Sequence, residues 1–241
     1  MKDQYFGDVN DYRKYGLLRV LLSGGELNLL VAWMLTPDDG GADGGMRDYL
    51  GQPERWRSFD PELFDSLASL LPHEVQPRVA LMEGSPILRV RYFSQLVPDQ
   101  LPARQEWGER LAAEADRADL VFLDPDNGIE IQSTPVGRKG SSKFVLWREI
   151  DRLWRAGSSI LVYQHFCHKP RVRFIKELAS ELQERTAASC IEAFRTANVL
   201  FLLAGQPRHE RILRRSIQHG LPNWKGQVDR IARAELRPDD S

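Results

Sequence analysis

Acidic and amide side chains directly follow one short apolar run in this sequence. The run Asp119–Leu123 leads into Asp124-Pro125-Asp126-Asn127-Gly128. Pro125 fixes its own φ and biases the preceding residue toward extended backbone, so the Asp124 carboxylate should leave the run in a defined direction. A carboxylate presented in this way could accept hydrogen bonds from an amino group or bind a metal ion. Because Asp, Pro, Asn and Gly are also turn formers, a plain loop is the alternative interpretation.

Two more polar clusters follow apolar runs in the same way. The run Leu29–Leu35 leads into the glycine-rich segment Thr36–Gly45, and Ser159–Tyr163 leads into Gln164–His168. The glycine-rich segment matches neither Gly-x-Gly-x-x-Gly nor a P-loop. Its aspartates suit a ribose hydroxyl, an amine or a cation better than a phosphate, and a flexible acidic loop is the alternative. In the third cluster, His165 could contact a substrate or cap the next helix.

A basic segment lies beyond the Asp124 cluster in the sequence. It reads Arg138-Lys139-Gly140-Ser141-Ser142-Lys143. Its cations could contact the phosphates of a nucleic acid, which positions the nucleic acid without reading its sequence. A solvated loop is the alternative interpretation of the same residues.

The apolar runs alternate with segments of helical periodicity along most of the chain. Helices are expected over Asp8–Leu22, Pro53–Leu71, Glu106–Ala118 and Pro207–His219. Strands are expected over Leu29–Leu35, Val79–Met82, Asp119–Leu123, Ser159–Tyr163, Cys190–Phe194 and Val199–Ala204, the last two as a hairpin. This alternation predicts an α/β fold with a mostly parallel sheet. Ligands bind outside the carboxyl ends of such strands, so the three polar clusters should converge there.

Length and composition narrow the functional classes. The 241 residues show no long linker or internal repeat, which predicts a single domain over 1–241. Lys plus Arg number 33 and Asp plus Glu 34, so any surface for nucleic acid must be a local patch. Two cysteines exclude a disulfide framework, and His165, Cys167 and His168 lack the second ligand cluster that structural zinc requires. With no signal peptide and no apolar run long enough for a membrane, we expect a cytoplasmic protein.

The order of these motifs resembles class I, Rossmann-like S-adenosylmethionine-dependent methyltransferases. Asp124-Pro125-Asp126-Asn127 resembles their Asp-Pro-Pro-Tyr motif, with Asp126 and Asn127 in place of the second proline and the aromatic residue. The pair of runs within Cys190–Ala204 stands where that fold has its sixth and seventh strands. The resemblance implies a three-layer sandwich with a seven-stranded, mostly parallel sheet and a C-terminal antiparallel hairpin.

A narrower resemblance is to ribosomal RNA adenine-N6 methyltransferases that have an N-terminal cofactor motif. The segment Phe6–Tyr15 resembles that motif, and Gly84-Ser85-Pro86 resembles a turn of the same family. The resemblance implies methyl transfer to an amino group of a nucleic acid, with Asp124 accepting from that group and Asn127 or His165 orienting it. The cofactor residues are then Asp8, Lys14, Thr36, Asp38, Gly40, Gly41 and Asp43. The substrate residues are then Asp126, Arg138, Lys139 and Lys143.

Two other functions fit the same residues. The carboxylates Asp124, Asp126 and Glu130 could hold Mg²⁺ or Mn²⁺ in a nuclease or phosphoesterase, with Asp38 or Asp39 across the cleft. Lys139 or Lys143 would then neutralise the phosphate. Alternatively, the same scaffold could serve as a binding protein without catalysis, because fold alone does not determine function.

Overall fold

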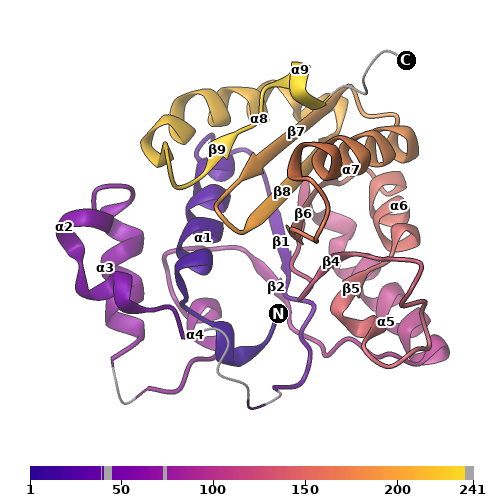
Figure 1. Cartoon of the computed structure of the whole chain (residues 1–241), viewed down its shortest axis with the longest axis horizontal. Helices are drawn as coiled ribbons and strands as arrows, with labels where there is room; N and C mark the ends of the chain where they lie inside the picture. Colours follow the sequence, from indigo (N-terminus) through magenta and orange to yellow (C-terminus); the bar gives the residue numbers. More distant parts are fainter. Residues whose placement is uncertain (39, 41–44, 73–74, 237–241) are drawn as a thin grey trace.

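The fold is built around one sheet of seven strands, seen in Figure 1. The computed structural model describes residues 1–38, 40, 45–72 and 75–236. The strands lie in the order β2-β1-β3-β6-β8-β7-β9. Their bounds are Leu29–Ala32 (β1), Arg91–Phe93 (β2), Leu120–Leu123 (β3), Ser159–His165 (β6), Cys190–Arg195 (β7), Val199–Gly205 (β8) and Asp229–Arg230 (β9).

Most strands of this sheet point in one direction. β1 pairs in parallel with β2 and β3, and β3 pairs in parallel with β6. β8 is antiparallel to both β6 and β7, and β9 is antiparallel to β7. β7 therefore runs with β6, so five of the seven strands share a direction. The predicted α/β class and mostly parallel seven-stranded sheet are confirmed.

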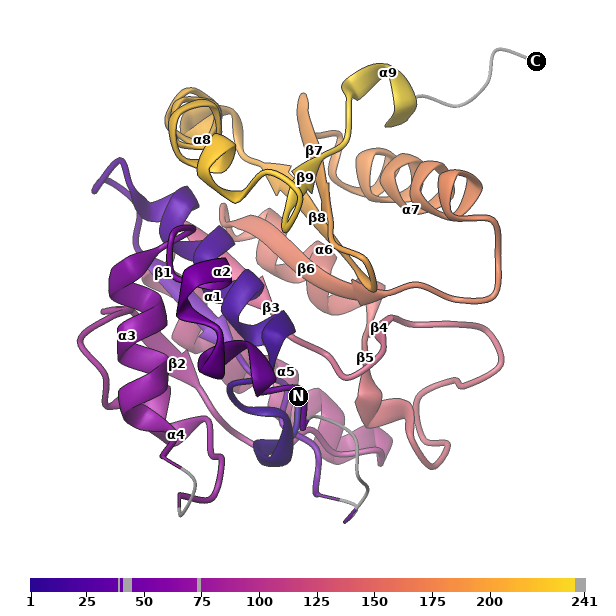
Figure 2. The same cartoon turned by 60° about the vertical axis from the view of Figure 1, so that its left-hand side comes forward.

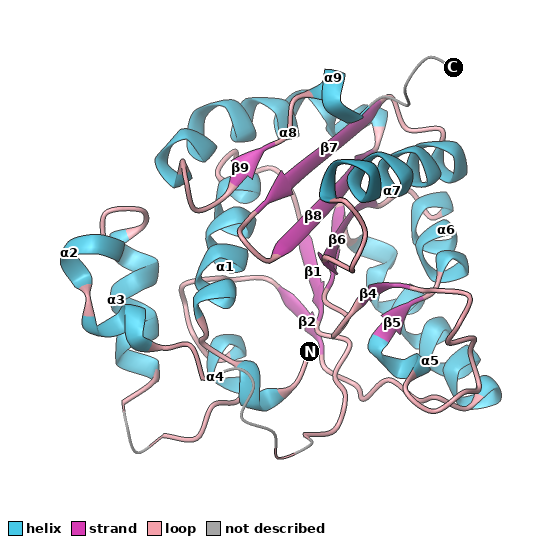
Figure 3. Cartoon of the chain, viewed as in Figure 1, coloured by secondary structure: helices cyan, strands magenta, loops and turns pink. Residues whose placement is uncertain are grey.

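Helices cover both faces of the sheet, as Figures 2 and 3 show. One core cluster joins the sheet to α1, α2, α3, α4 and α8, and the other joins it to α5, α6, α7 and α9. The helices span Val9–Leu22 (α1), Pro53–Trp56 (α2), Pro61–Leu70 (α3), Ala80–Glu83 (α4), Leu101–Glu114 (α5), Trp147–Arg155 (α6), Arg171–Thr186 (α7), Pro207–Gly220 (α8) and Arg233–Leu236 (α9).

The strand sequences explain how the sheet holds two cores at once. Along β1, Leu29 and Val31 pack into one cluster while Leu30 and Ala32 pack into the other. Successive side chains of a strand point to opposite faces, and helices bury both, so the central strands are apolar throughout. This pattern makes β1 and β3 readable as short continuous apolar runs.

The expected strand over Val79–Met82 is wrong, because this segment forms the single turn α4. The backbone N–H of Val79 donates to Asp3 Oδ1 at 2.9 Å, which ties the segment to the start of the chain instead of to a neighbouring strand. Met82 is fully buried and packs into the core cluster on the α1 side of the sheet. A run of four mostly apolar residues does not distinguish a short strand from a single helical turn.

A small ladder outside the main sheet positions the chain after Asp124. Gly128–Ile129 (β4) pairs in parallel with Phe144–Val145 (β5). Gly128 has φ +126°, and a Cβ there would lie 2.2 Å from Gln164 Oε1. That oxygen accepts from the Ile129 N–H at 2.8 Å. The glycine therefore lets the loop lie against the end of β6, close to His165.

Among the helices of the described ranges, none is both long and apolar enough to cross a membrane.

Candidate functional site

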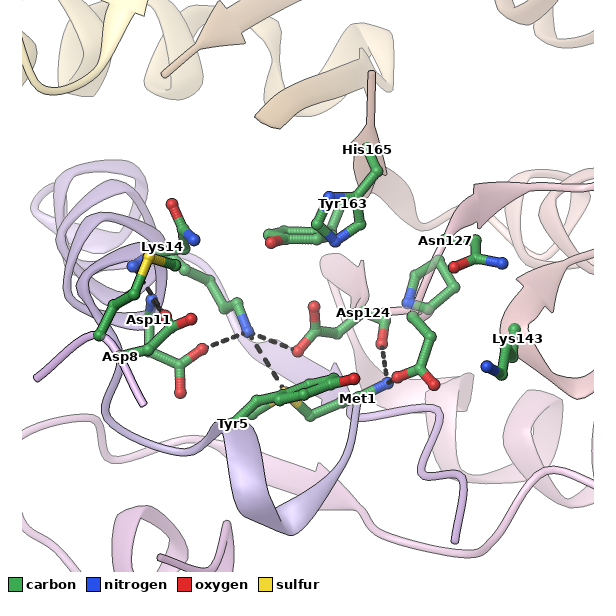
Figure 4. Close-up of a pocket in the computed structure, with 14 residues that line it drawn as sticks. Met1, Tyr5, Asp8, Asp11, Lys14, Asp124, Asn127, Lys143, Tyr163 and His165 are labelled. Carbon is green, nitrogen blue, oxygen red and sulfur yellow. Dashed lines mark hydrogen bonds and ion pairs between the residues drawn. The ribbon is translucent and has the colours of Figure 1, made fainter. Parts of the chain in front are cut away.

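A pocket of about 330 Å³ lies at the carboxyl ends of β3 and β6, shown in Figure 4. Its walls come from the first residues of the chain, the N-terminal turns of α1, the segment after β3, and the end of β6. The lining residues are Met1, Tyr5, Asp8, Asn10, Asp11, Lys14, Met46, Asp124, Pro125, Asp126, Asn127, Lys143, Tyr163 and His165. The pocket therefore joins residues that are far apart in the sequence, at the sheet edge where ligands bind in α/β proteins.

Lys14 is the centre of the buried charge in this pocket. Its Nζ lies 2.7 Å from Asp11 Oδ1 and 2.7 Å from Asp124 Oδ2, and the two ion pairs are buried. The amine also lies over the ring of Tyr163, 5.1 Å from the centroid. One cation is thus shared between a helix carboxylate and a strand-end carboxylate.

Asp11 is fixed by donors other than Lys14. Its Oδ2 accepts from the Tyr15 hydroxyl at 3.0 Å and from the Gly7 N–H at 2.9 Å. Gly7 has φ +79°, and a Cβ there would lie 2.0 Å from Leu71 Cδ1, so only glycine fits this turn. The N-terminal turn and α1 together hold Asp11 in one orientation.

Asp124 and Asp126 are held by the first residue of the chain. The Met1 amine donates to the backbone oxygen of Asp124 at 3.0 Å and lies 2.6 Å from Asp126 Oδ1. The other oxygen of Asp126 accepts from Thr36 Oγ1 at 2.6 Å. Asp124 Oδ1 points away from Lys14 into the pocket, on the side of Tyr163 (Figure 4). This oxygen is not used in the ion pair with Lys14, so it can accept a hydrogen bond from a group in the pocket.

Burial and neighbouring charges together shift the pKa values of Asp124, Lys14 and Asp8. It raises the pKa of Asp124, with Lys14 opposing the shift. For Lys14 burial favours the neutral amine, but Asp11 and Asp124 outweigh it and raise the pKa above its ordinary value. Burial and the nearby Asp11 raise the pKa of Asp8 to about 7. Lys14 therefore stays charged at neutral pH, whereas Asp8 changes its protonation state there.

Asp8 combines a structural role with this raised pKa. It is the N-cap of α1, and its Oδ1 accepts from the Asn10 and Asp11 N–H groups at 2.7 and 2.9 Å. Such a cap stabilises the helix because it satisfies donors that lack a partner within the helix. Asp8 itself forms no ion pair with any residue that the structure describes, and the neighbouring Lys14 is paired with Asp11 and Asp124.

Aromatic rings close the pocket on the β6 side. Tyr163 is almost fully buried, and its ring meets that of His165 edge-on at 5.1 Å between centroids. Burial, followed by the negative charge of Asp124, raises the pKa of Tyr163 well above its ordinary value, so its hydroxyl remains protonated. Burial lowers the pKa of His165, which favours a neutral imidazole. The site thus offers flat, uncharged surfaces beside the Asp124 carboxylate.

Seven of the predicted site residues line this one pocket. They are Asp8, Lys14, Asp124, Asp126, Asn127, Lys143 and His165. Asn127 and Lys143 are brought together by the hydrogen bond from the Asn127 N–H to the Lys143 carbonyl, at 2.9 Å. The predicted convergence of the Asp124–Gly128 and Gln164–His168 clusters is therefore found in the structure.

The glycine-rich cluster Thr36–Gly45 contributes less to the pocket than the sequence predicted. Thr36 donates its backbone N–H to the Met1 carbonyl, and Asp38 accepts from the Gln4 N–H at 3.3 Å. Neither residue lines the pocket, although Thr36 contacts the lining residues Met1 and Asp126, and Gly40 is likewise not part of its wall. Gly41 and Asp43 lie outside the described residues, as does Asp39.

Two predicted substrate residues also lie away from the pocket. Arg138 and Lys139 are exposed, and the Arg138 guanidinium donates to the Ser133 carbonyl at 2.6 Å within its own loop. Only Lys143 of the basic segment reaches the pocket.

The three carboxylates proposed as metal ligands do not form a joint site. Glu130 Oε1 accepts from the Trp147 N–H at 2.6 Å, at the start of α6, while Asp124 and Asp126 are paired with Lys14 and the Met1 amine. Glu130 therefore satisfies a helix terminus instead. In the part of the chain that the structure describes, no group of three His, Cys, Asp or Glu side chains is placed to hold a metal ion.

Sequence reasoning missed several pocket residues, chiefly Asn10, Asp11 and Tyr163. Two of them carried a detectable signal. Asp11 lies three residues before Lys14, on the same side of a helix. Tyr163 lies two residues before His165, so both side chains point to the same face of β6. Met1 and Tyr5 carried no comparable signal.

Comparison with known proteins adds no family to this description, since no protein-family model and no curated protein matches the sequence.

Proposed function

We propose that this protein is an S-adenosylmethionine-dependent methyltransferase that acts on an amino group of a nucleic acid. The observation that carries the proposal is the ion pair between Lys14 and Asp124, which are 110 residues apart. Each belongs to one of the two segments that resemble methyltransferase motifs, Phe6–Tyr15 and Asp124–Asn127. Their meeting at 2.7 Å in one pocket is what a shared cofactor and acceptor site requires.

The strand order supports the same proposal. β8 lies between β6 and β7 and runs against both, and residues 196–198 connect β7 directly to β8. The resemblance predicts such a closing antiparallel hairpin for the sixth and seventh strands. With helices on both faces, this arrangement is consistent with a three-layer sandwich of the Rossmann-like methyltransferase type.

The residues present in the pocket fit the cofactor. A volume of about 330 Å³ is at the lower end of the roughly 300–1,000 Å³ typical of small-molecule sites. S-adenosylmethionine has an ammonium and a sulfonium group, and the pocket wall includes four carboxylates, of which Asp8 forms no ion pair with a described residue. The rings of Tyr5 and Tyr163 suit a sulfonium or an adenine face. When bound, the cofactor supplies a methyl group activated by its sulfonium.

Asp124 would orient the acceptor nitrogen. Its pocket-facing oxygen can accept a hydrogen bond from an amino N–H, which aims the nitrogen lone pair at the methyl group. Lys14 holds the carboxylate in place, and its positive charge opposes the rise in the Asp124 pKa that burial causes. Fixed charge of this kind in a buried site contributes more to the rate than the same charge in water.

The aromatic wall would receive the base. A base must leave the nucleic-acid stack to reach a buried carboxylate, and extruded bases stack on aromatic side chains. The sequence has Asn127 where the related motif has an aromatic residue, and Tyr163 and His165 provide rings on the adjacent strand instead. Lys143 at the pocket wall would contact a phosphate of the substrate.

A methyl-transfer assay tests the proposal. The protein is incubated with S-adenosylmethionine labelled in the methyl group, EDTA, and separate pools of single-stranded RNA and DNA. We expect label to enter one pool, and Asp124→Asn to lower the rate by about 10²–10³-fold, the typical effect of removing one fixed polar contact to the reacting group. Asp116→Asn, an exposed site after α5, is the matched control and should transfer normally. Equal transfer by Asp124→Asn and wild type would overturn the assignment of Asp124.

A further inference from the structure

A second hollow, of about 400 Å³, lies at the far end of α1 from the pocket described above. It is formed by the turn after α1 and by one face of α8, which Figure 2 shows side by side. α1 has 14 residues, so the two sites are separated by roughly 20 Å along that helix. The hollow is therefore a separate feature of the molecule.

The wall on the α8 side is basic. Arg211, Arg215 and His219 line the hollow and follow one another at intervals of four residues, which places them on one side of the helix. Both arginines are exposed, and neither forms an ion pair with any residue in the described ranges. Arg214, on another side of α8, is instead paired with Glu210. Two guanidinium groups are thus left available in the hollow.

The floor of the hollow contains a polar group without a partner. Ser216 is 3 % exposed, and its Oγ has no hydrogen-bond partner in the described part of the chain. Gly24 lies directly beside it, because a Cβ on Gly24 would approach Ser216 Oγ to 3.3 Å and the Ile212 side chain to 2.9 Å. Buried hydroxyls are normally hydrogen-bonded, so an unpaired one next to two free arginines indicates a missing acceptor.

We propose that this hollow binds a phosphate monoester carried by a ligand of nucleotide size. Guanidinium groups form paired hydrogen bonds with phosphate oxygens, which is why arginine is favoured at phosphate sites. A phosphate oxygen would also provide the acceptor that Ser216 lacks. Glu26 lines the same hollow and opposes an anion there, so its removal should strengthen binding. The proposal does not depend on the methyltransferase assignment.

Titration calorimetry with three probes tests this site and distinguishes the source of the phosphate. The probes are inorganic phosphate, AMP, and an oligonucleotide with either a 5′-phosphate or a 5′-hydroxyl. We expect saturable binding of AMP or of the phosphorylated oligonucleotide, and weaker binding of inorganic phosphate. Preference for AMP would identify a free nucleotide, and preference for the oligonucleotide would identify a nucleic-acid end.

Variants of the residues in and near the hollow test whether they bind the phosphate. R211Q/R215Q should weaken binding at least about tenfold, since two charge-assisted contacts are lost. R214Q removes the same type of charge from the same helix outside the hollow and should leave the affinity unchanged. E26Q should tighten binding two- to threefold, by roughly the effect of one exposed charge. Absence of saturable binding by every phosphorylated probe, or an equal loss in R214Q, would overturn the proposal.

Discussion

Two buried ion clusters lie on opposite faces of the sheet and differ in how completely they are paired. Arg104 and Glu149 form a two-point pair at 2.6 and 2.8 Å, and Arg104 also donates to the Phe144 carbonyl at 2.8 Å. Glu149 accepts from the Leu146 N–H at 3.0 Å as well. In the pocket cluster, Lys14 is shared between Asp11 and Asp124, and Asp8 has no ion-pair partner among the residues that the structure describes.

This difference is the one we expect between a structural ion pair and the ligand site that we propose. Both clusters are buried, so burial alone does not distinguish them. The Arg104 cluster balances one cation with one anion and connects α5 to the start of α6. The Lys14 cluster has an excess of carboxylates beside a pocket, and the pKa of Asp8 is raised to about 7. Groups with shifted pKa values in a cleft are typical of functional sites.

The largest expected effect comes from breaking the balanced pair. Arg104→Met leaves Glu149 buried without its cation, which should lower the free energy of unfolding by about 3–5 kcal/mol. Urea unfolding at pH 7 measures this loss. Arg110→Met, at an exposed position on the same helix, should change stability by less than about 0.5 kcal/mol. A similarly small loss for Arg104→Met would show that the pair contributes little.

The loss of stability in the corresponding variant Lys14→Met should depend on pH. Lys14→Met leaves Asp11 and Asp124 facing each other, and two close buried carboxylates cannot both remain ionised. The pKa of one of them therefore rises. A raised folded-state pKa contributes stability at low pH that is lost as pH increases. We expect a loss of about 3 kcal/mol at pH 8 and a clearly smaller loss at pH 5, measured by urea unfolding. A loss independent of pH would argue against shared charge.

Asp8→Asn should stabilise the protein at high pH, whereas Lys14→Met should destabilise it there. Asparagine caps a helix about as well as aspartate, so the variant removes the charge and keeps the cap. The pKa of Asp8 is about 7 in the folded protein and ordinarily 3.8, so wild type should lose stability as pH rises between these values. Asp8→Asn should therefore be more stable than wild type at pH 8, by about 1 kcal/mol or more, and similar at pH 4. Thermal melts across this range test it, and parallel pH profiles would contradict it.

The smallest effect is expected at the pocket wall. Lys143→Ala should raise the KM for the nucleic acid about three- to tenfold with little change in kcat, because a phosphate contact positions substrate without joining the reaction. Lys139→Ala is the matched control, since Lys139 is exposed outside the pocket. The salt dependence of binding should weaken in Lys143→Ala and stay unchanged in Lys139→Ala. A lowered kcat in Lys143→Ala would instead indicate that Lys143 acts on the reacting groups.

The sequence predicted the fold correctly where a single residue pattern determines a secondary-structure element. The apolar runs at β1, β3 and β6 were recognisable because both of their faces are buried. The general rule that ligands bind at carboxyl ends of strands then located Asp124 and His165. Asp124 could be proposed as a site residue because it follows a buried strand and directly precedes Pro125.

Long-range partners could not be read in this way. Nothing near Lys14 in the sequence indicates Asp124 as its partner, except through the family resemblance. The position of Met1 against β1 and β3 displaced Thr36 and Asp38 from the predicted cofactor site, and it depends on packing across the whole sheet edge. Glu130 was predicted as a metal ligand, but it accepts a hydrogen bond from the Trp147 N–H at the start of α6. The residues next to Glu130 in the sequence do not distinguish these two roles.

Binding of S-adenosylmethionine tests the central claim most directly. Calorimetric titration in EDTA would compare wild type, Asp8→Asn and the control Asp116→Asn. The account predicts saturable binding by wild type and by the control, and about tenfold weaker binding by Asp8→Asn, because a ligand cation loses its carboxylate partner. The same substitution would then stabilise the free protein and weaken the complex. Absence of saturable heat in wild type, or unchanged affinity in Asp8→Asn, would contradict the assignment of this pocket as the cofactor site.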